Sequence, residues 1–137
     1  MTAAHAATWD GSELDGLWTN ELNWAGDTLP AASETIDIAT GDAVSGLGLS
    51  GQNLPSDCTV NLSANSSLTQ PSGAIRMNDA TLNVASGSGL TGNGWWDLDG
   101  ATINFEDGAI ATMNNWEQKD LNSFTFKLGT TGFTALR

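Results

Sequence analysis

The sequence is poor in positive charge. It holds 4 Lys and Arg residues against 16 Asp and Glu residues, which gives a formal net charge of −12 at pH 7. A surface this acidic repels the phosphate backbone of DNA and RNA, so nucleic acid is excluded as an expected partner. The same electrostatic field attracts cations and basic protein surfaces.

Cysteine and long apolar runs are also scarce. The single Cys cannot form a disulfide within the chain, and no stretch approaches the roughly 20 apolar residues that cross a bilayer. The N-terminus, Met-Thr-Ala-Ala-His-Ala-Ala, has neither the basic start nor the apolar centre of a signal peptide. We therefore expect no membrane insertion. We also expect either a chain used without export of its own or a piece of a larger protein.

Catalytic patterns are missing as well. The sequence has no Ser/His/Asp or Cys/His arrangement, no phosphate-binding loop and no zinc-ligand spacing. Paired carboxylates for glycoside hydrolysis stay open, because acidic residues are abundant. A short solenoid offers little groove, however, and this chain has few of the basic residues that lyases use. A small polysaccharide lyase or hydrolase is the least favoured alternative, and we expect a protein that is not an enzyme.

What the sequence does contain is a repeat. Residues 101–113 match residues 80–92 at an offset of 21 residues. The residues that open successive units are spaced by 24, 22, 21 and 21 positions, and they are Ile36, Val60, Leu82, Ile103 and Phe124. A period of this length is typical of solenoids. Together with period-2 strands it predicts an all-β fold, a short right-handed parallel β-helix of about five coils of 21–24 residues.

Three short strands per coil are expected. The first carries two inward apolar residues, at positions 36/38, 60/62, 82/84, 103/105 and 124/126. The second carries one inward apolar residue, in turn Val44, Leu68, Leu90, Ile110 and Phe133. The third is visible at residues 75–77 and 96–98. Cys58 aligns with Ala80 and Ala101, so we expect a buried structural thiol there and no nucleophile.

The outward positions of the first strand form a column of mostly amide side chains. Its members are Asp37, Asn61, Asn83, Asn104 and Thr125. Because stacked amides can hydrogen-bond along a solenoid, we expect Asn61, Asn83 and Asn104 to stabilise the fold, with contact to a ligand or partner as the alternative. The column lacks the repeated Thr-x-Thr ranks of an ice-binding plane, which disfavours that function.

Trp95 and Trp96 are adjacent, so a strand directs them to opposite faces. If Trp96 fills the core, Trp95 stands outward, where it suits a subunit interface, a covering loop or a sugar ring. We expect Trp116, one coil later, in the same patch. Asp97 and Asp99 offer oxygen ligands for Ca²⁺, although no complete calcium motif surrounds them and solvated acidic turns are the default. We expect no other cofactor.

The first quarter of the chain has another character. Trp9, Trp18 and Trp24 lie in a segment rich in Asp-Gly turns, without the repeat. We expect these tryptophans to form the core of a cap that covers the exposed end of the first coil. The predicted division is a flexible arm over residues 1–8, a Trp-rich capping segment over residues 9–34 and the solenoid over residues 35–137.

The capping segment also carries a resemblance. The sequences Thr-Trp-Asp-Gly, Leu-Trp-Thr-Asn and Asn-Trp, followed by Pro30 and an alternating strand at residues 35–38, resemble the opening of bacterial β-solenoid modules. Such modules occur in large secreted surface proteins of the autotransporter-repeat type, and similar openings follow the initiator Met in short phage structural proteins. The resemblance covers about the first third of the chain. It implies a β-solenoid and says little about activity.

These features favour a non-catalytic structural or attachment protein. We expect a decoration or fibre component on the virion surface, a homotrimer with its solenoids side by side, docked on a capsid protein. The alternative is a glycan-binding or adhesive module of a secreted bacterial surface protein, at the cell surface, with Trp95 and Trp116 as its platform. The C-terminal sequence ends almost inside a strand, so we expect a further coil or a partner there.

Overall fold

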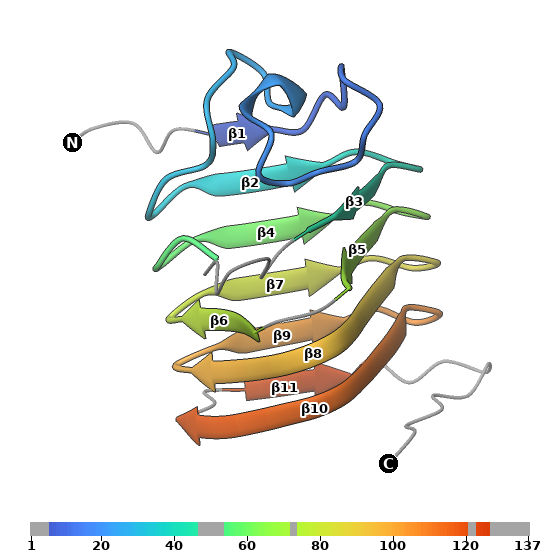
Figure 1. Cartoon of the computed structure of the whole chain (residues 1–137). Coiled ribbons are helices and arrows are strands. Elements are labelled where there is room, and N and C mark those ends of the chain that lie inside the picture. The colour runs from blue at the N-terminus through green and yellow to red at the C-terminus, as the bar shows by residue number, and fades with distance from the viewer. Residues whose placement is uncertain (1–5, 47–53, 72–73, 121–122, 127–137) are drawn as a thin grey trace.

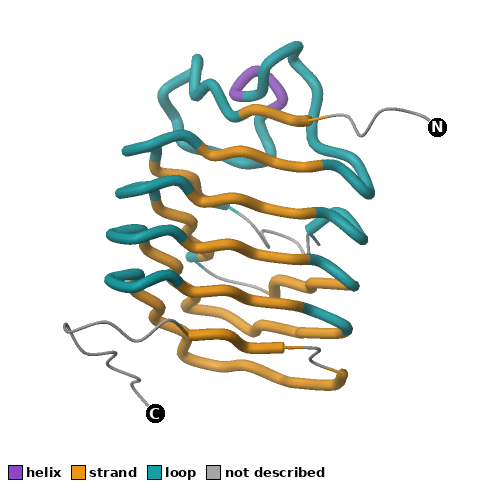
Figure 2. Tube along the Cα trace, turned by 180° about the vertical axis from the view of Figure 1, so that it is seen from behind, coloured by secondary structure: helices purple, strands orange, loops and turns teal. Residues whose placement is uncertain are grey.

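The computed structural model describes residues 6–46, 54–71, 74–120 and 123–126. In this part the chain winds through stacked parallel strands, with an irregular segment over the first coil (Figure 1). Seen from behind, the strands of the larger sheet lie one above another like rungs (Figure 2). The predicted all-β solenoid is therefore confirmed.

The larger sheet contains six strands in the order β1-β2-β4-β7-β9-β11. Their bounds are Ala6–Thr8 for β1, Thr35–Ile38 for β2, Thr59–Leu62 for β4, Thr81–Val84 for β7, Thr102–Phe105 for β9 and Ser123–Phe126 for β11. The parallel pairing aligns the residues that open the sequence repeat, namely Ile36, Val60, Leu82, Ile103 and Phe124. The predicted coil lengths are therefore correct.

The smaller sheet has the order β10-β8-β5-β3, and β6 pairs with β8. The bounds are Ala43–Ser45 for β3, Ser67–Gln70 for β5, Ala74–Asn78 for β6, Gly89–Asp99 for β8 and Ile110–Asp120 for β10. The sequence predicts two short strands per coil here, whereas β8 and β10 each run through both. Pro71 lies between β5 and β6, and proline interrupts a strand because it has no N–H for the ladder. No proline falls within β8 or β10.

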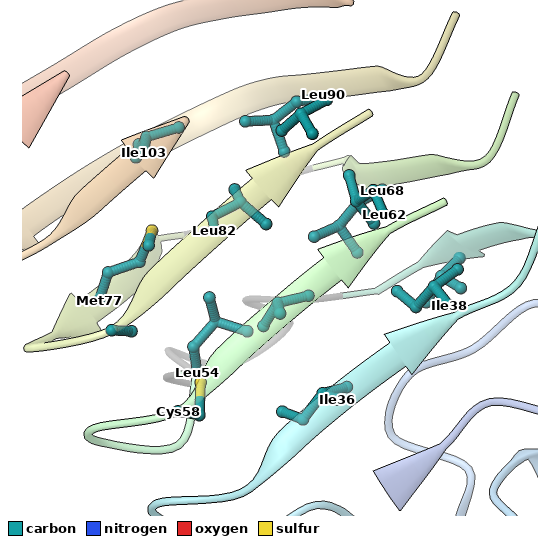
Figure 3. Close-up of a cluster of buried hydrophobic side chains, with 14 of the residues drawn as sticks. Ile36, Ile38, Leu54, Cys58, Leu62, Leu68, Met77, Leu82, Leu90 and Ile103 are labelled. Carbon is teal, nitrogen blue, oxygen red and sulfur yellow. The ribbon is translucent and has the colours of Figure 1, made fainter. Parts of the chain in front are cut away.

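The core lies between the two sheets (Figure 3). In β2, β4, β7 and β9 half-buried and buried residues alternate, as period-2 strands require. Ile36 and Leu82 from the larger sheet and Leu68 from the smaller sheet are almost completely buried. Burying such a side chain contributes roughly 1.5–3 kcal/mol relative to leaving it exposed.

One predicted core position is wrong. Ile110 was expected to point inward, but its side chain is 64% exposed, and Ala111 takes the place in register with Leu90. In the three earlier coils the inward residue follows the opening residue by a constant interval, as Leu90 follows Leu82. The same interval from Ile103 leads to Ala111. The constant turn length therefore overrides the larger apolar side chain one position earlier.

The two turns that flank the larger sheet repeat their backbone geometry. Each has a column of residues with positive φ, in one turn Ser33, Asp57, Asp79 and Gly100, and in the other Gly41, Asn65, Gly87 and Gly108. At Gly100 a Cβ atom would collide with the Asp79 carboxylate, so glycine is needed for space as well as for φ. These identical corners keep the strands of successive coils in register.

The capping segment is built on three buried tryptophans. The rings of Trp9 and Trp18 meet the ring of Trp24 edge-on, with centroids 5.1 and 4.7 Å away. Trp24 Nε1 donates a hydrogen bond of 2.9 Å to the backbone oxygen of Trp18, so the buried indole is also satisfied. The predicted role of these tryptophans as the core of the cap is confirmed.

Asn23 fastens the loops of the cap together. It closes the short 3₁₀ helix Glu21–Asn23 and is fully buried. Its Oδ1 accepts from the backbone N–H of Glu13, and its Nδ2 donates to Asp15 Oδ1 and to the oxygen of Leu17. The carboxylate of Asp15 accepts hydrogen bonds from Leu17, Asn20 and Asn23, and these lower the pKa of Asp15 below the usual 3.8.

The cap also continues both sheets beyond the first coil. Strand β1 pairs with β2, and Leu17 forms a parallel bridge to Ser45 in β3. Residues 6–8, which the sequence assigns to a flexible arm, therefore belong to the larger sheet. The backbone oxygen of Thr8 accepts a hydrogen bond from Ala25, so the capping loop shields the outer side of β1.

Candidate functional site on the six-stranded sheet

The outer face of the larger sheet carries the predicted amide column. Asn61 Nδ2 donates to Asp37 Oδ1, Asn83 Nδ2 to Asn61 Oδ1, and Asn104 Nδ2 to Asn83 Oδ1, each at 2.8 Å. The expected hydrogen bonding along the solenoid is confirmed, and these four residues are called the Asn ladder below. All the bonds run toward the N-terminus and end on a carboxylate, which accepts hydrogen bonds and donates none when ionised.

A second column lies beside the Asn ladder, two residues earlier in each strand. The register aligns Thr35, Thr59, Thr81, Thr102 and Ser123. The threonines are half-buried, like the amides next to them. This Thr column was not predicted from the sequence, although the recurring motif Thr-x-Asp/Asn indicates it. The two columns together form a regular polar strip along the solenoid.

The strip is nearly free of charge, although the protein is strongly acidic. Among its described side chains only Asp37, at the end near the cap, is ionisable. The acidic residues lie instead at the turns on either side, for example Asp57 and Asp79 before the strands and Glu106 and Asp107 after them. The strip therefore presents hydrogen-bonding groups with little charge of their own, between two acidic borders.

A shallow hollow of about 310 Å³ runs beside the Asn ladder. It is lined by Asn61, Leu62, Ser63, Asn83, Val84, Ala85, Asn104 and Glu106. The amides form one wall, and the residues two positions later in each strand form the other. Leu62 and Val84 have their side chains in the core, so they contribute backbone to the floor. The volume is at the lower end of the roughly 300–1,000 Å³ of small-molecule sites.

Trp95 and Trp116 lie in β8 and β10, but their side chains are outside the described residues. The backbone register aligns Trp116 with Trp96 and places Asn115 beside Trp95, because the register shifts between Met113 and Asn115. The two tryptophans therefore do not hold equivalent positions in successive coils. The register gives the expected common patch no support, and their binding roles stay predictions.

The predicted calcium ligands Asp97 and Asp99 lie only partly within the described residues. Asp99 is exposed, its backbone oxygen accepts a hydrogen bond of 2.8 Å from Asp79, and the side chain of Asp97 is outside the described residues. Within the described part of the chain, no three His, Cys, Asp or Glu side chains are grouped so that they could hold a metal ion. A Ca²⁺ site at Asp97 and Asp99 therefore stays a prediction.

Cys58 is a buried part of the core. Its side chain is buried in the same column as Ala80 and Ala101, as predicted. Removal of the thiol from water raises its pKa from 9.0 to about 11, with a smaller contribution from the negative charge of Asp57. Since the thiolate is the nucleophilic form, this environment suppresses thiol chemistry at neutral pH.

Comparisons with known proteins do not add to this geometry. No family model, curated protein or solved structure matches the chain. In the described residues, no helix has the length and apolar character needed to cross a membrane. The candidate site is therefore interpreted from its own residues, with the Asn ladder, the Thr column and the hollow as its parts.

Proposed function

We propose that this protein is a non-catalytic structural or attachment component, in the first place a decoration or fibre protein of a virion. It assembles as a homotrimer whose solenoids lie side by side, and the end remote from the cap supplies further contacts between chains. The acidic surface supports docking on a basic protein lattice, because opposite charges attract over the range of the Debye length.

The observation that carries this proposal is the contrast between the two ends of the described solenoid. At one end the cap lies against β1 and β3. At the other end β10 and β11 are the terminal strands of the two sheets, and no described strand pairs with their outer sides. A sheet edge of this kind is a template for pairing with another chain.

A second candidate is a glycan-binding or adhesive module at a bacterial cell surface. The hollow beside the Asn ladder favours it, because amide side chains both donate to and accept from sugar hydroxyls. The genes that flank the reading frame separate the two candidates. Neighbouring capsid genes support the virion component, and a longer secreted reading frame supports the adhesive module.

Light scattering on the purified protein tests the assembly. We expect a mass three times the 14.2 kDa of the chain at physiological ionic strength. A strictly monomeric protein at high concentration would contradict the proposal. High salt should strengthen the trimer if charge repulsion between the acidic subunits opposes it.

A matched pair of variants locates the interface. Ser123→Lys places a charge on the terminal strand β11, whereas Thr35→Lys places the same charge in the same column but on the inner strand β2. Lysine on an edge strand opposes pairing with other chains. We expect Ser123→Lys to lower the measured mass and Thr35→Lys to leave it unchanged. The opposite pattern would place the interface away from β11.

A further inference from the structure

The amides in the middle of the Asn ladder keep part of their hydrogen-bonding capacity. Asn61 and Asn83 each use one N–H as donor and their oxygen as acceptor within the ladder. A carboxamide has two N–H donors and two oxygen lone pairs, so one donor and one acceptor remain on each residue. Because the ladder fixes the amide planes, these groups are presented to the hollow in a preset orientation.

The remaining groups also recur at a regular distance. Parallel strands lie ~4.8 Å apart, so the solenoid offers one donor and one acceptor per coil at about this spacing. Neighbouring hydroxyls of a pyranose ring can accept and donate one hydrogen bond each, which matches one amide. Rings in an extended, β-1,4-linked chain advance by nearly the same distance as the coils. The agreement between the ring spacing and the coil spacing favours a sugar polymer that lies parallel to the solenoid axis.

We propose that the hollow beside the Asn ladder binds an extended, neutral polysaccharide, with about one sugar ring per coil. The proposal rests on the second candidate function and gives it a site. It moves the sugar from Trp95 and Trp116, where the sequence places it, to Asn61, Asn83 and Asn104 on the other sheet. An acidic chain is disfavoured because acidic turns flank the strip on both sides and repel it.

The lining also predicts how strongly the site binds. Among the described residues no aromatic side chain lines the hollow, so they offer no ring stacking there. Each ring is held by hydrogen bonds in a shallow site, which gives weak binding for a short sugar. Affinity should therefore rise from disaccharide to trisaccharide and then level off, because the hollow spans the three coils from Asn61 to Asn104.

The test is a titration of the full chain with cello-oligosaccharides and chito-oligosaccharides from disaccharide to hexasaccharide, followed by calorimetry. Hydroxyethylcellulose and alginate serve as neutral and acidic polymers in affinity electrophoresis. We expect binding that strengthens with length, retardation by the neutral polymer, and no retardation by alginate. Absence of binding to every neutral probe, or preference for alginate, would overturn the proposal.

A pair of variants separates the hollow from the rest of the surface. Ala85→Gln fills the hollow without replacing a residue of the Asn ladder, whereas Ser86→Gln adds the same side chain at an exposed neighbour outside the lining. We expect Ala85→Gln to weaken binding at least about tenfold and Ser86→Gln to leave it unchanged. Equal binding by both variants would overturn the site. Circular dichroism of each variant confirms that the fold is intact.

The outcomes distinguish this proposal from the assembly proposal. A trimer that binds no neutral sugar overturns the polysaccharide site and leaves the structural function standing. A protein that binds sugar through the hollow but remains monomeric supports the site and contradicts the trimer.

Discussion

In the coils of this protein the same contacts recur at each level, whereas in the cap each contact occurs once. Asn61, Asn83 and Asn104 repeat one hydrogen bond at one distance, and the turns repeat their positive-φ positions. The cap instead depends on a single group of tryptophans and on Asn23, which joins several loops through bonds of different kinds.

The difference shows how stability is distributed. In a solenoid each repeat contacts only its neighbours, so the loss of one repeated contact leaves the others in place. In the cap, removal of one central side chain affects every loop that meets there. Substitutions in the cap are therefore expected to cost more free energy of unfolding than comparable substitutions on the outer face of the coils.

Trp24→Ala should have the largest effect. The substitution removes a completely buried ring, both edge-on ring contacts and the hydrogen bond to Trp18. We expect a loss of about 3–5 kcal/mol in the free energy of unfolding, as for other buried aromatic residues. Urea denaturation followed by circular dichroism measures it. A loss below about 1 kcal/mol would show that the cap is not held by this cluster.

Asn83→Leu should have an intermediate effect. Asn83 takes part in two ladder bonds, whereas Asn104 takes part in one among the described residues. Since a net hydrogen bond contributes roughly 0.5–1.5 kcal/mol, Asn83→Leu should cost about twice as much as the control Asn104→Leu. Thermal or urea unfolding provides the comparison. Equal losses of unfolding free energy would indicate that the hydrogen bonds of the Asn ladder do not contribute separately to stability.

Acid should loosen the cap through Asp15. The pKa of this carboxyl is lowered in the folded protein, so its stabilising effect is present above the unfolded value near 3.8 and is lost as the pH falls through the folded value. Tryptophan fluorescence between neutral and acidic pH reports the change. The control Asp15→Asn should be less stable at neutral pH and should lack this part of the acid dependence. An unchanged acid profile in the variant would contradict the assignment.

Ile110→Thr should have the smallest effect. Ile110 is largely exposed, so the substitution should change the free energy of unfolding by no more than about 0.5 kcal/mol. The matched variant Leu90→Thr removes a fully buried side chain in the neighbouring strand and introduces a hydroxyl, and should cost several-fold more. Similar losses of unfolding free energy in the two variants would indicate that Ile110 is buried in the core.

The coils could be predicted from the sequence because period-2 strands and repeated turns are local patterns. The spacing of Ile36, Val60 and Leu82 predicted the register of the strands. The alternation of inward and outward residues along each strand predicted that Asn61 points outward, into the Asn ladder. The alternation of apolar residues alone could not predict that Ile110 points outward, because the length of the preceding turn also sets which residue points inward. The two-strand interpretation of β8 failed for a similar reason, since strand continuity there depends on the absence of a proline.

The cap and the candidate site were predicted less completely. Burial of the tryptophans followed from their size, but the connections made by Asn23 join residues with no periodic relation. The hollow depends on the depth between the Asn ladder and the residues two positions later in each strand, and the sequence does not show this depth. The register shift before Asn115 likewise separates Trp95 from Trp116 in a way that equal spacing conceals.

Small-angle X-ray scattering is the most direct test of the proposed assembly, because it measures mass and shape together. The claim is that three capped solenoids assemble side by side into one structural unit. We expect a forward scattering intensity that corresponds to three 14.2 kDa chains and a profile broader than that of one solenoid. A profile that fits a single solenoid of one chain at every concentration would contradict it.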